Sequence, residues 1–161
     1  MKLNNESLKD TAFWNKAGIK LPGFNREAMI AATLASPKWV HFGAGNIFRA
    51  FPAALMQSLL EQGLETTGIV VAEGYDGEII DKCFTPCDNL TLLVTLKSNG
   101  TTDKQVIASI ASSLRLDRDF AELKNIFTNP SLQMVSFTIT EKGYKLIDKN
   151  NAFLPEIADK E

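Results

Sequence analysis

The stretch Trp39-Val40-His41-Phe42-Gly43-Ala44-Gly45-Asn46-Ile47-Phe48-Arg49 decides the fold of this chain. A short apolar run ends in Gly-x-Gly and leads directly into a segment whose apolar residues recur at helical spacing. This order predicts a strand, a tight turn and a helix. The first glycine permits the turn, the second lets a pyrophosphate approach the backbone, and the N–H groups that begin the helix point toward the anion.

A second apolar run, residues 68–72, is followed by Glu73 at a separation that fits strand, turn, helix and strand. Glu73 is the candidate for gripping the adenosine ribose, because its carboxylate accepts both hydroxyl protons and repels a 2′-phosphate. NAD is then preferred over NADP, and Asp76 is placed to share this role. The alternative for Glu73 is an ordinary acid at the end of a strand.

The glycine pattern departs from Gly-x-Gly-x-x-Gly, because Phe48 stands where the third glycine would be. Arg49 follows in the first turns of the helix. It is placed to bind a phosphate or a substrate carboxylate in a bidentate manner, or else to pair with a surface acid. The candidate cofactor-binding residues of this segment are Gly43, Ala44, Gly45, Asn46, Ile47, Phe48 and Arg49.

Polar residues also follow the last apolar run, residues 132–139, where an open α/β sheet places its ligand crevice. Thr140 and Glu141 are therefore further candidates for cofactor binding. Glu141 is a candidate for a position beside a nicotinamide or on a proton path, and a helix-capping acid is the alternative.

Composition fits one soluble globular domain of 161 residues, with 45% hydrophobic and 22% charged residues. The net charge of −2 and the lack of a Lys/Arg-dense block argue against a nucleic-acid partner. The start of the chain has no basic and apolar leader, and no run approaches the roughly 20 apolar residues that span a bilayer, so we expect a cytoplasmic protein with no membrane contact. Cys83 and Cys87 are too few for a disulfide framework and lack the neighbours of a zinc site, so we expect ordinary thiols and no metal.

Strand and helix signals alternate along the chain. We expect helices at 7–16, 25–35, 47–63 and 117–127, a short helix or turn at 75–84, strands at 38–42, 68–72, 89–96 and 132–139, and a second hairpin arm at 105–116, for which a helix is the alternative. The fold class is therefore α/β, a doubly wound and mostly parallel sheet with a β-hairpin insertion. Residues 1–37 form a helical preamble, and residues 38–161 form the dinucleotide-binding domain.

Two segments, residues 41–51 and 136–144, carry a signature that resembles the mannitol dehydrogenase family of long-chain polyol and uronate dehydrogenases. The likeness extends from about Trp39 to Tyr144. It implies a Rossmann-like N-terminal domain that binds NAD and a mainly helical C-terminal domain that bears the lysine acid/base with its Asn and His partners. We therefore expect this chain to be an incomplete enzyme without catalytic residues, whose partners are the C-terminal domain and a small sugar acid or polyol. The histidine in this chain, His41, lies inside a strand and is expected to be a packed core residue.

The resemblance implies an NAD-dependent oxidoreductase that interconverts a sugar alcohol or aldonate and its keto form. D-mannonate and D-fructuronate are the first candidates, because Arg49 would complement a carboxylate. Mannitol 2-dehydrogenase is the alternative within the family, and a non-catalytic nucleotide-binding sensor is the alternative outside it.

Overall fold

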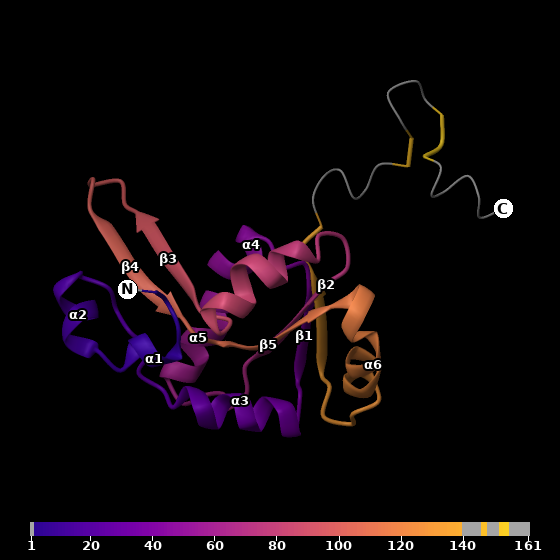
Figure 1. The fold of residues 1–161 in the computed structure, drawn as a ribbon, viewed down its shortest axis with the longest axis horizontal. Helices are drawn as coiled ribbons and strands as arrows, with labels where there is room; N and C mark the ends of the chain where they lie inside the picture. Colours follow the sequence, from indigo (N-terminus) through magenta and orange to yellow (C-terminus); the bar gives the residue numbers. More distant parts are fainter. Residues whose placement is uncertain (1, 140–145, 148–151, 155–161) are drawn as a thin grey trace.

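A parallel sheet forms the centre of the molecule (Figure 1). The computed structural model describes residues 2–139, 146–147 and 152–154. Within them, four strands lie in the order β5-β2-β1-β6, and every pairing is parallel. The strands are β1 (Trp39–Phe42), β2 (Ile69–Glu73), β5 (Ile110–Arg115) and β6 (Met134–Phe137).

Helices cover both faces of this sheet. The α-helices of the described residues are α1 (Asn5–Leu8), α2 (Thr11–Lys16), α3 (Arg26–Ala35), α4 (Asn46–Ala50), α5 (Pro52–Glu61) and α6 (Leu116–Phe127), of which α3 to α6 cover the sheet. On one face, Ile69 and Val71 of β2 pack with residues of α3, α4 and α5. On the other face, Val70 and Ala72 pack with Leu123 of α6. Alternate residues of β2 are thus buried on opposite sides, which explains its unbroken apolar run and confirms the doubly wound sheet.

The predicted hairpin is present, but the expectation that its second strand spans residues 105–116 is wrong. β3 (Thr91–Leu96) pairs antiparallel with β4 (Thr102–Ile107), and Ile110 already begins β5 in the main sheet. The chain changes direction at Ala108, where the Gln57 side chain donates to the carbonyl of Val106 at 2.8 Å and accepts from the N–H of Ala108 at 2.7 Å. The amide of α5 satisfies the buried backbone at this break, so an apolar run that reads as continuous becomes two strands.

Two predicted helices are each broken in two. The helix expected at 7–16 is divided into α1 and α2, since Asn4 and Asp10 each cap the N-terminus of a separate helix. The helix expected at 47–63 breaks at Phe51, which has φ −120° and ψ −71°. Pro52 causes this break because proline lacks an N–H and disfavours helical geometry in the preceding residue. Pro52 therefore begins α5.

The segment expected as a short helix or turn at 75–84 contains a π-helical turn, η1 (Ile80–Phe84), followed by a 3-10 turn, η2 (Thr85–Cys87). The expected helices at 25–35 and 117–127 are confirmed as α3 and α6. The expected strand at 132–139 is confirmed as the shorter β6.

The preamble packs against the base of the hairpin. Leu3, Leu8 and Ile19 contact the buried cluster that contains Leu90 and Val106. The backbone of Lys20 also exchanges hydrogen bonds of 2.9 Å with β4, donating to the carbonyl of Lys104 and accepting from the N–H of Val106. The division into a preamble and a cofactor domain stays a prediction, although these contacts join the two segments closely.

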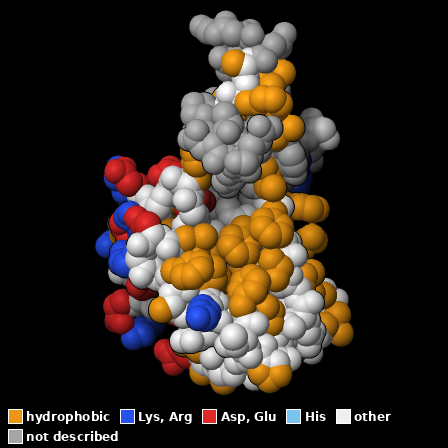
Figure 2. All heavy atoms as spheres, turned by 90° about the vertical axis from the view of Figure 1, so that its right-hand side faces the viewer, with side chains coloured by type: hydrophobic (Ala, Val, Ile, Leu, Met, Phe, Trp, Pro, Cys, Tyr) orange, Lys and Arg blue, Asp and Glu red, His pale blue; other side chains and the backbone are white. Residues whose placement is uncertain are grey.

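Apolar side chains gather on the face that carries β6 and α6 (Figure 2). Phe42 stacks on Phe137 with ring centroids 5.0 Å apart and meets the edge of Phe127 at 6.2 Å. Phe127 and Phe137 remain 47% and 58% exposed. We call these three residues the aromatic patch. Among the described strands, β6 pairs only with β1, so the patch lies at an open edge of the sheet.

Candidate cofactor site

The first glycine of the turn after β1 is required by its geometry. Gly43 has φ +105°, a conformation that side-chain-bearing residues rarely adopt. A Cβ at this position would lie 2.7 Å from the hydroxyl oxygen and 2.9 Å from the carbonyl oxygen of Thr138, directly after β6. The Gly43 N–H donates to the carbonyl of Ala72 at 2.9 Å. The turn therefore packs closely between β2 and Thr138, the residue after β6.

The side chain of Glu73, at the end of β2, also binds the turn after β1. Its carboxylate accepts the buried N–H of Ala44 at 2.8 Å and the N–H groups of Tyr75 and Asp76 at 2.8 and 3.1 Å. The side chain thus joins the turn after β1 to the loop after β2. A carboxylate offers about four acceptor positions, so three are already used. The ribose contact stays a prediction, and Asp76 is exposed beside it.

Gly45 precedes helix α4 and faces open space. Its φ of −70° is accessible to any residue, and a Cβ would meet no atom within 4 Å. Asn46 and Ile47, the first two residues of α4, are exposed, Ile47 to 66%. The backbone N–H groups at a helix start have no partner within the helix. The structure therefore brings open space and backbone donors together where the sequence predicts a pyrophosphate.

Phe48 is part of the core below this turn. It is fully buried, and its ring stacks on the imidazole of His41 with centroids 4.3 Å apart. The position of the missing third glycine is therefore filled by an aromatic contact between α4 and β1. This burial leaves only the Phe48 backbone available for contact with a cofactor.

His41 is buried as expected, and it lies within a chain of hydrogen bonds. Its Nδ1 is 2.7 Å from the hydroxyl of Ser136, and its Nε2 is 3.1 Å from the hydroxyl of Thr138. The indole N–H of Trp39, which can only donate, points at the same Ser136 oxygen at 2.6 Å. If each donor is used once, Ser136 donates to Nδ1 and the imidazole proton lies on Nε2. Burial lowers the pKa of His41 to about 4, so the ring is neutral at pH 7.

Arg49 has one nitrogen without a partner. Among the described residues, its Nε is the buried side-chain nitrogen or oxygen that makes no hydrogen bond. One terminal nitrogen donates to the side-chain carbonyl of Asn46, and the guanidinium lies 5.7 Å from the centre of the Phe84 ring. An unsatisfied buried donor is costly, and an anion would reach this nitrogen only after the Arg49 side chain moved. No surface acid pairs with Arg49 among the described residues.

The structure brings the residues of segment 43–49 and Glu73 together at the carboxyl ends of β1 and β2. Thr140 and Glu141 lie outside the described residues. Sequence reasoning missed that Glu73 binds the N–H of Ala44 and that His41 reaches Thr138. The acid that ends β2 and the hydroxyl residues Ser136, within β6, and Thr138, just after it, were the available signals.

The described part of the chain contains no candidate metal site and no membrane-spanning helix. Within residues 2–139, 146–147 and 152–154, no group of His, Cys, Asp or Glu is arranged to hold a metal ion. Cys83 is exposed and Cys87 half-buried, and both are free thiols. No helix in the same residues is long and apolar enough to cross a membrane.

Comparison with known proteins places this geometry in a family. The chain is 48% identical to D-mannonate oxidoreductase of Thermotoga maritima, over 99% of this chain and 30% of that protein. It is 30% identical to mannitol 2-dehydrogenase of Cereibacter sphaeroides, over 86% of this chain and 28% of that protein. The chain thus spans about a third or less of the length of these relatives.

A solved structure of a mannitol 2-dehydrogenase has a similar fold. Mannitol 2-dehydrogenase of Pseudomonas fluorescens, in a ternary complex with NAD and D-mannitol, superposes with a TM-score of 0.75 at 27% identity, over 99% of this chain and 31% of that one. The profile of the mannitol dehydrogenase Rossmann domain matches residues 37–160. The chain therefore belongs to the mannitol dehydrogenase family, and residues 37–160 correspond to its Rossmann domain.

Proposed function

We propose that this chain is the NAD-binding part of an oxidoreductase that interconverts D-mannonate and D-fructuronate. The observation that carries the proposal is the 48% identity to a D-mannonate oxidoreductase over almost the whole chain, against 30% to a mannitol 2-dehydrogenase. Arg49 supports an acidic substrate or a phosphate, because its partly exposed guanidinium pairs with no acid among the described residues.

The residues of the site fit a dinucleotide. Gly45 has open space where a side chain would stand, so a pyrophosphate can approach the backbone. Glu73 keeps acceptor capacity for a ribose hydroxyl beside its three backbone contacts. Bound NAD(H) would supply the hydride chemistry. The chain's own residues would hold the pyrophosphate at 43–49 and the adenosine ribose at Glu73.

The substrate and the acid/base group are proposed to lie with further polypeptide of the same enzyme. The aromatic patch supports this, because Phe127 and Phe137 expose large apolar surface at the open edge of β6. A cytoplasmic location belongs to the same proposal. The part of the enzyme described here would orient the cofactor, and proximity to the substrate would supply much of the rate enhancement.

The experiment that tests the cofactor is a calorimetric titration of the chain with NADH and with NADPH. We expect binding of NADH and a weaker response to NADPH. No heat and no change in NADH fluorescence at millimolar concentration would refute the proposal. The substrate is tested on the enzyme that contains this chain, with fructuronate and fructose as the oxidised substrates. Faster NADH oxidation with fructose would assign the enzyme to the second candidate.

The second candidate, mannitol 2-dehydrogenase, is favoured by one observation. The superposed Pseudomonas fluorescens enzyme contains D-mannitol and shares this fold at 27% identity. The two candidates differ in whether the substrate carries a carboxylate. Arg49→Met should therefore impair turnover of fructuronate more than turnover of fructose, if Arg49 reaches the substrate.

A further inference from the structure

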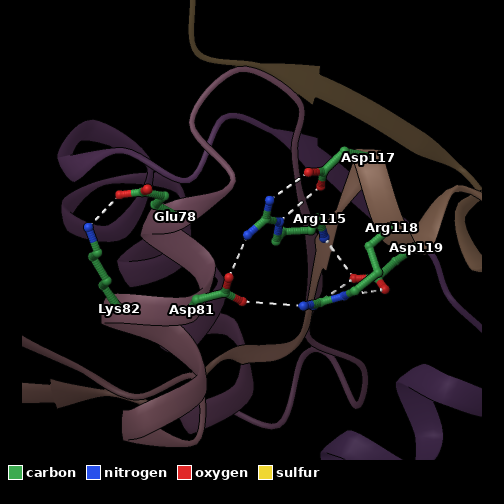
Figure 3. A network of polar contacts seen from close by, with 7 residues as sticks. All are labelled: Glu78, Asp81, Lys82, Arg115, Asp117, Arg118 and Asp119. Atoms are coloured by element: carbon green, nitrogen blue, oxygen red, sulfur yellow. Dashed lines mark hydrogen bonds and ion pairs between the residues drawn. The ribbon is translucent and has the colours of Figure 1, made fainter.

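A network of charged side chains lies at the carboxyl end of β5 (Figure 3). Arg115, the last residue of β5, donates hydrogen bonds to two carboxylates. Its Nε and one terminal nitrogen donate to Asp117 at 2.9 and 2.5 Å, and the other terminal nitrogen donates to Asp81 at 2.5 Å. Arg118 similarly binds Asp119 at 2.9 and 3.1 Å and reaches Asp81 at 3.3 Å. Both guanidinium groups are thus occupied by acids.

Arg115 lies beside the candidate ribose site. In the register of the two strands it is the partner of Glu73. Its guanidinium also lies against the loop after β2, because a Cβ on Gly77 would be 2.7 Å from its Nε and 3.0 Å from its Cζ. The same loop is held by Glu73 through the N–H groups of Tyr75 and Asp76. One acid and one arginine therefore shape the loop that would surround the adenosine ribose.

The chemistry of this position depends on whether the arginine is free. An arginine near the end of the second strand accommodates the 2′-phosphate of NADP, because its planar guanidinium binds phosphate in a bidentate manner. Here the guanidinium nitrogens of Arg115 that would bind the 2′-phosphate already donate to carboxylates. Arg115 holds the pKa of Asp81 and Asp117 below their usual range, so both stay ionised at neutral pH. The network in Figure 3 has four carboxylates and three cations, so it also repels a phosphate.

We propose that Asp81 and Asp117 withhold Arg115 from the cofactor and thereby set a preference for NAD over NADP. This inference rests on the proposed function, since it assumes that Glu73 and its loop receive the adenosine ribose. It differs from discrimination by Glu73 alone, because the arginine needed for a 2′-phosphate is already present. Removing the two aspartate charges would release it.

The test compares the dissociation constants of NADH and NADPH for the chain and for an Asp81→Asn/Asp117→Asn variant. Both aspartates are partly exposed, with side-chain exposures of 43% and 63%, so the exchange does not open the core. We expect the affinity for NADPH relative to NADH to rise at least about tenfold, which corresponds to one charge-assisted hydrogen bond gained by the phosphate. Adding Arg115→Met to the double variant should remove that gain.

Glu78→Gln is the matched control. It removes one negative charge from the same network, where Glu78 pairs with Lys82 and makes no hydrogen bond to an arginine among the described residues. It should change the ratio less than about twofold, the size of a screened surface charge effect. An equal shift in the control, a gain that survives Arg115→Met, or a double variant with an unchanged ratio would overturn the proposal. If the parent chain binds NADH, these outcomes leave the proposed function intact, whereas a parent that binds neither cofactor refutes both.

Discussion

Replacing Glu73 by glutamine should weaken the whole glycine turn and not merely the choice of cofactor. The carboxylate accepts three backbone N–H groups with its two oxygens. A glutamine has one acceptor oxygen and one NH₂ group. If its oxygen faces Tyr75 and Asp76, its NH₂ meets the buried N–H of Ala44. If it is turned the other way, the loop after β2 loses both of its bonds.

The better orientation leaves Ala44 unsatisfied and replaces two charge-assisted bonds by neutral ones. A buried donor without a partner costs about 1–3 kcal/mol, and a neutral acceptor binds more weakly than a charged one. We therefore expect Glu73→Gln to lower the free energy of unfolding by about 2–3 kcal/mol. The affinity for NADH should fall with it, because the turn proposed to receive the pyrophosphate is no longer held in one geometry.

Urea unfolding followed by circular dichroism measures the first effect, and calorimetry measures the second. Glu61→Gln is a matched control, since Glu61 accepts the N–H of Gly23 at 2.9 Å at an exposed position where water replaces it. The control should change stability by less than about 0.5 kcal/mol. A loss in Glu73→Gln no larger than in the control would refute this account of the turn.

Three further changes address the same region. Gly43→Ala should cost about 1–3 kcal/mol in urea unfolding, because φ is +105° and the Cβ would lie 2.7 Å from the Thr138 hydroxyl; unaltered stability would contradict this. Gly45→Val should unfold thermally like the parent yet lose NADH affinity in calorimetry, because the valine side chain enters the open space proposed for the pyrophosphate; normal binding would remove Gly45 from the site. The folded-state pKa of His41, about 4, lies below the unfolded value of about 6.5. The contribution of neutral His41 to the free energy of unfolding is therefore complete above pH 6.5, and about 3 kcal/mol of that free energy is lost as the pH falls to 4. His41→Gln should flatten the curve of stability against pH between these two values, and a curve identical to that of the parent would exclude His41 as the cause.

The parallel sheet was predictable because its central strands are buried on both faces. β2 reads as an unbroken run of Ile, Val and Ala for this reason, and the glycine turn after β1 marks where the first helix follows. The caps of α3 and the apolar stripe of α6 are likewise local signals. In each case the residues that determine the element lie within it or next to it.

The break between β4 and β5 was not predictable in this way. Val106, Ile107 and Ile110 are all fully buried, so the apolar pattern is continuous across the two strands. The signal for the break is the side chain of Gln57, about 50 residues earlier in the chain, which binds the backbone on both sides of Ile107. A contact between distant segments overrides local propensity here.

The candidate site shows the same division between local and distant causes. The Gly-x-Gly spacing locates the turn, but its shape comes from Glu73 in β2 and Thr138 after β6. These contacts consume the first two backbone donors, because the N–H of Gly43 binds the carbonyl of Ala72 and that of Ala44 binds Glu73. The next N–H, that of Gly45, has no acceptor among the described hydrogen bonds. We therefore propose that a pyrophosphate meets its first backbone donor at Gly45, the residue that faces open space in a turn that Glu73 holds through the N–H of Ala44.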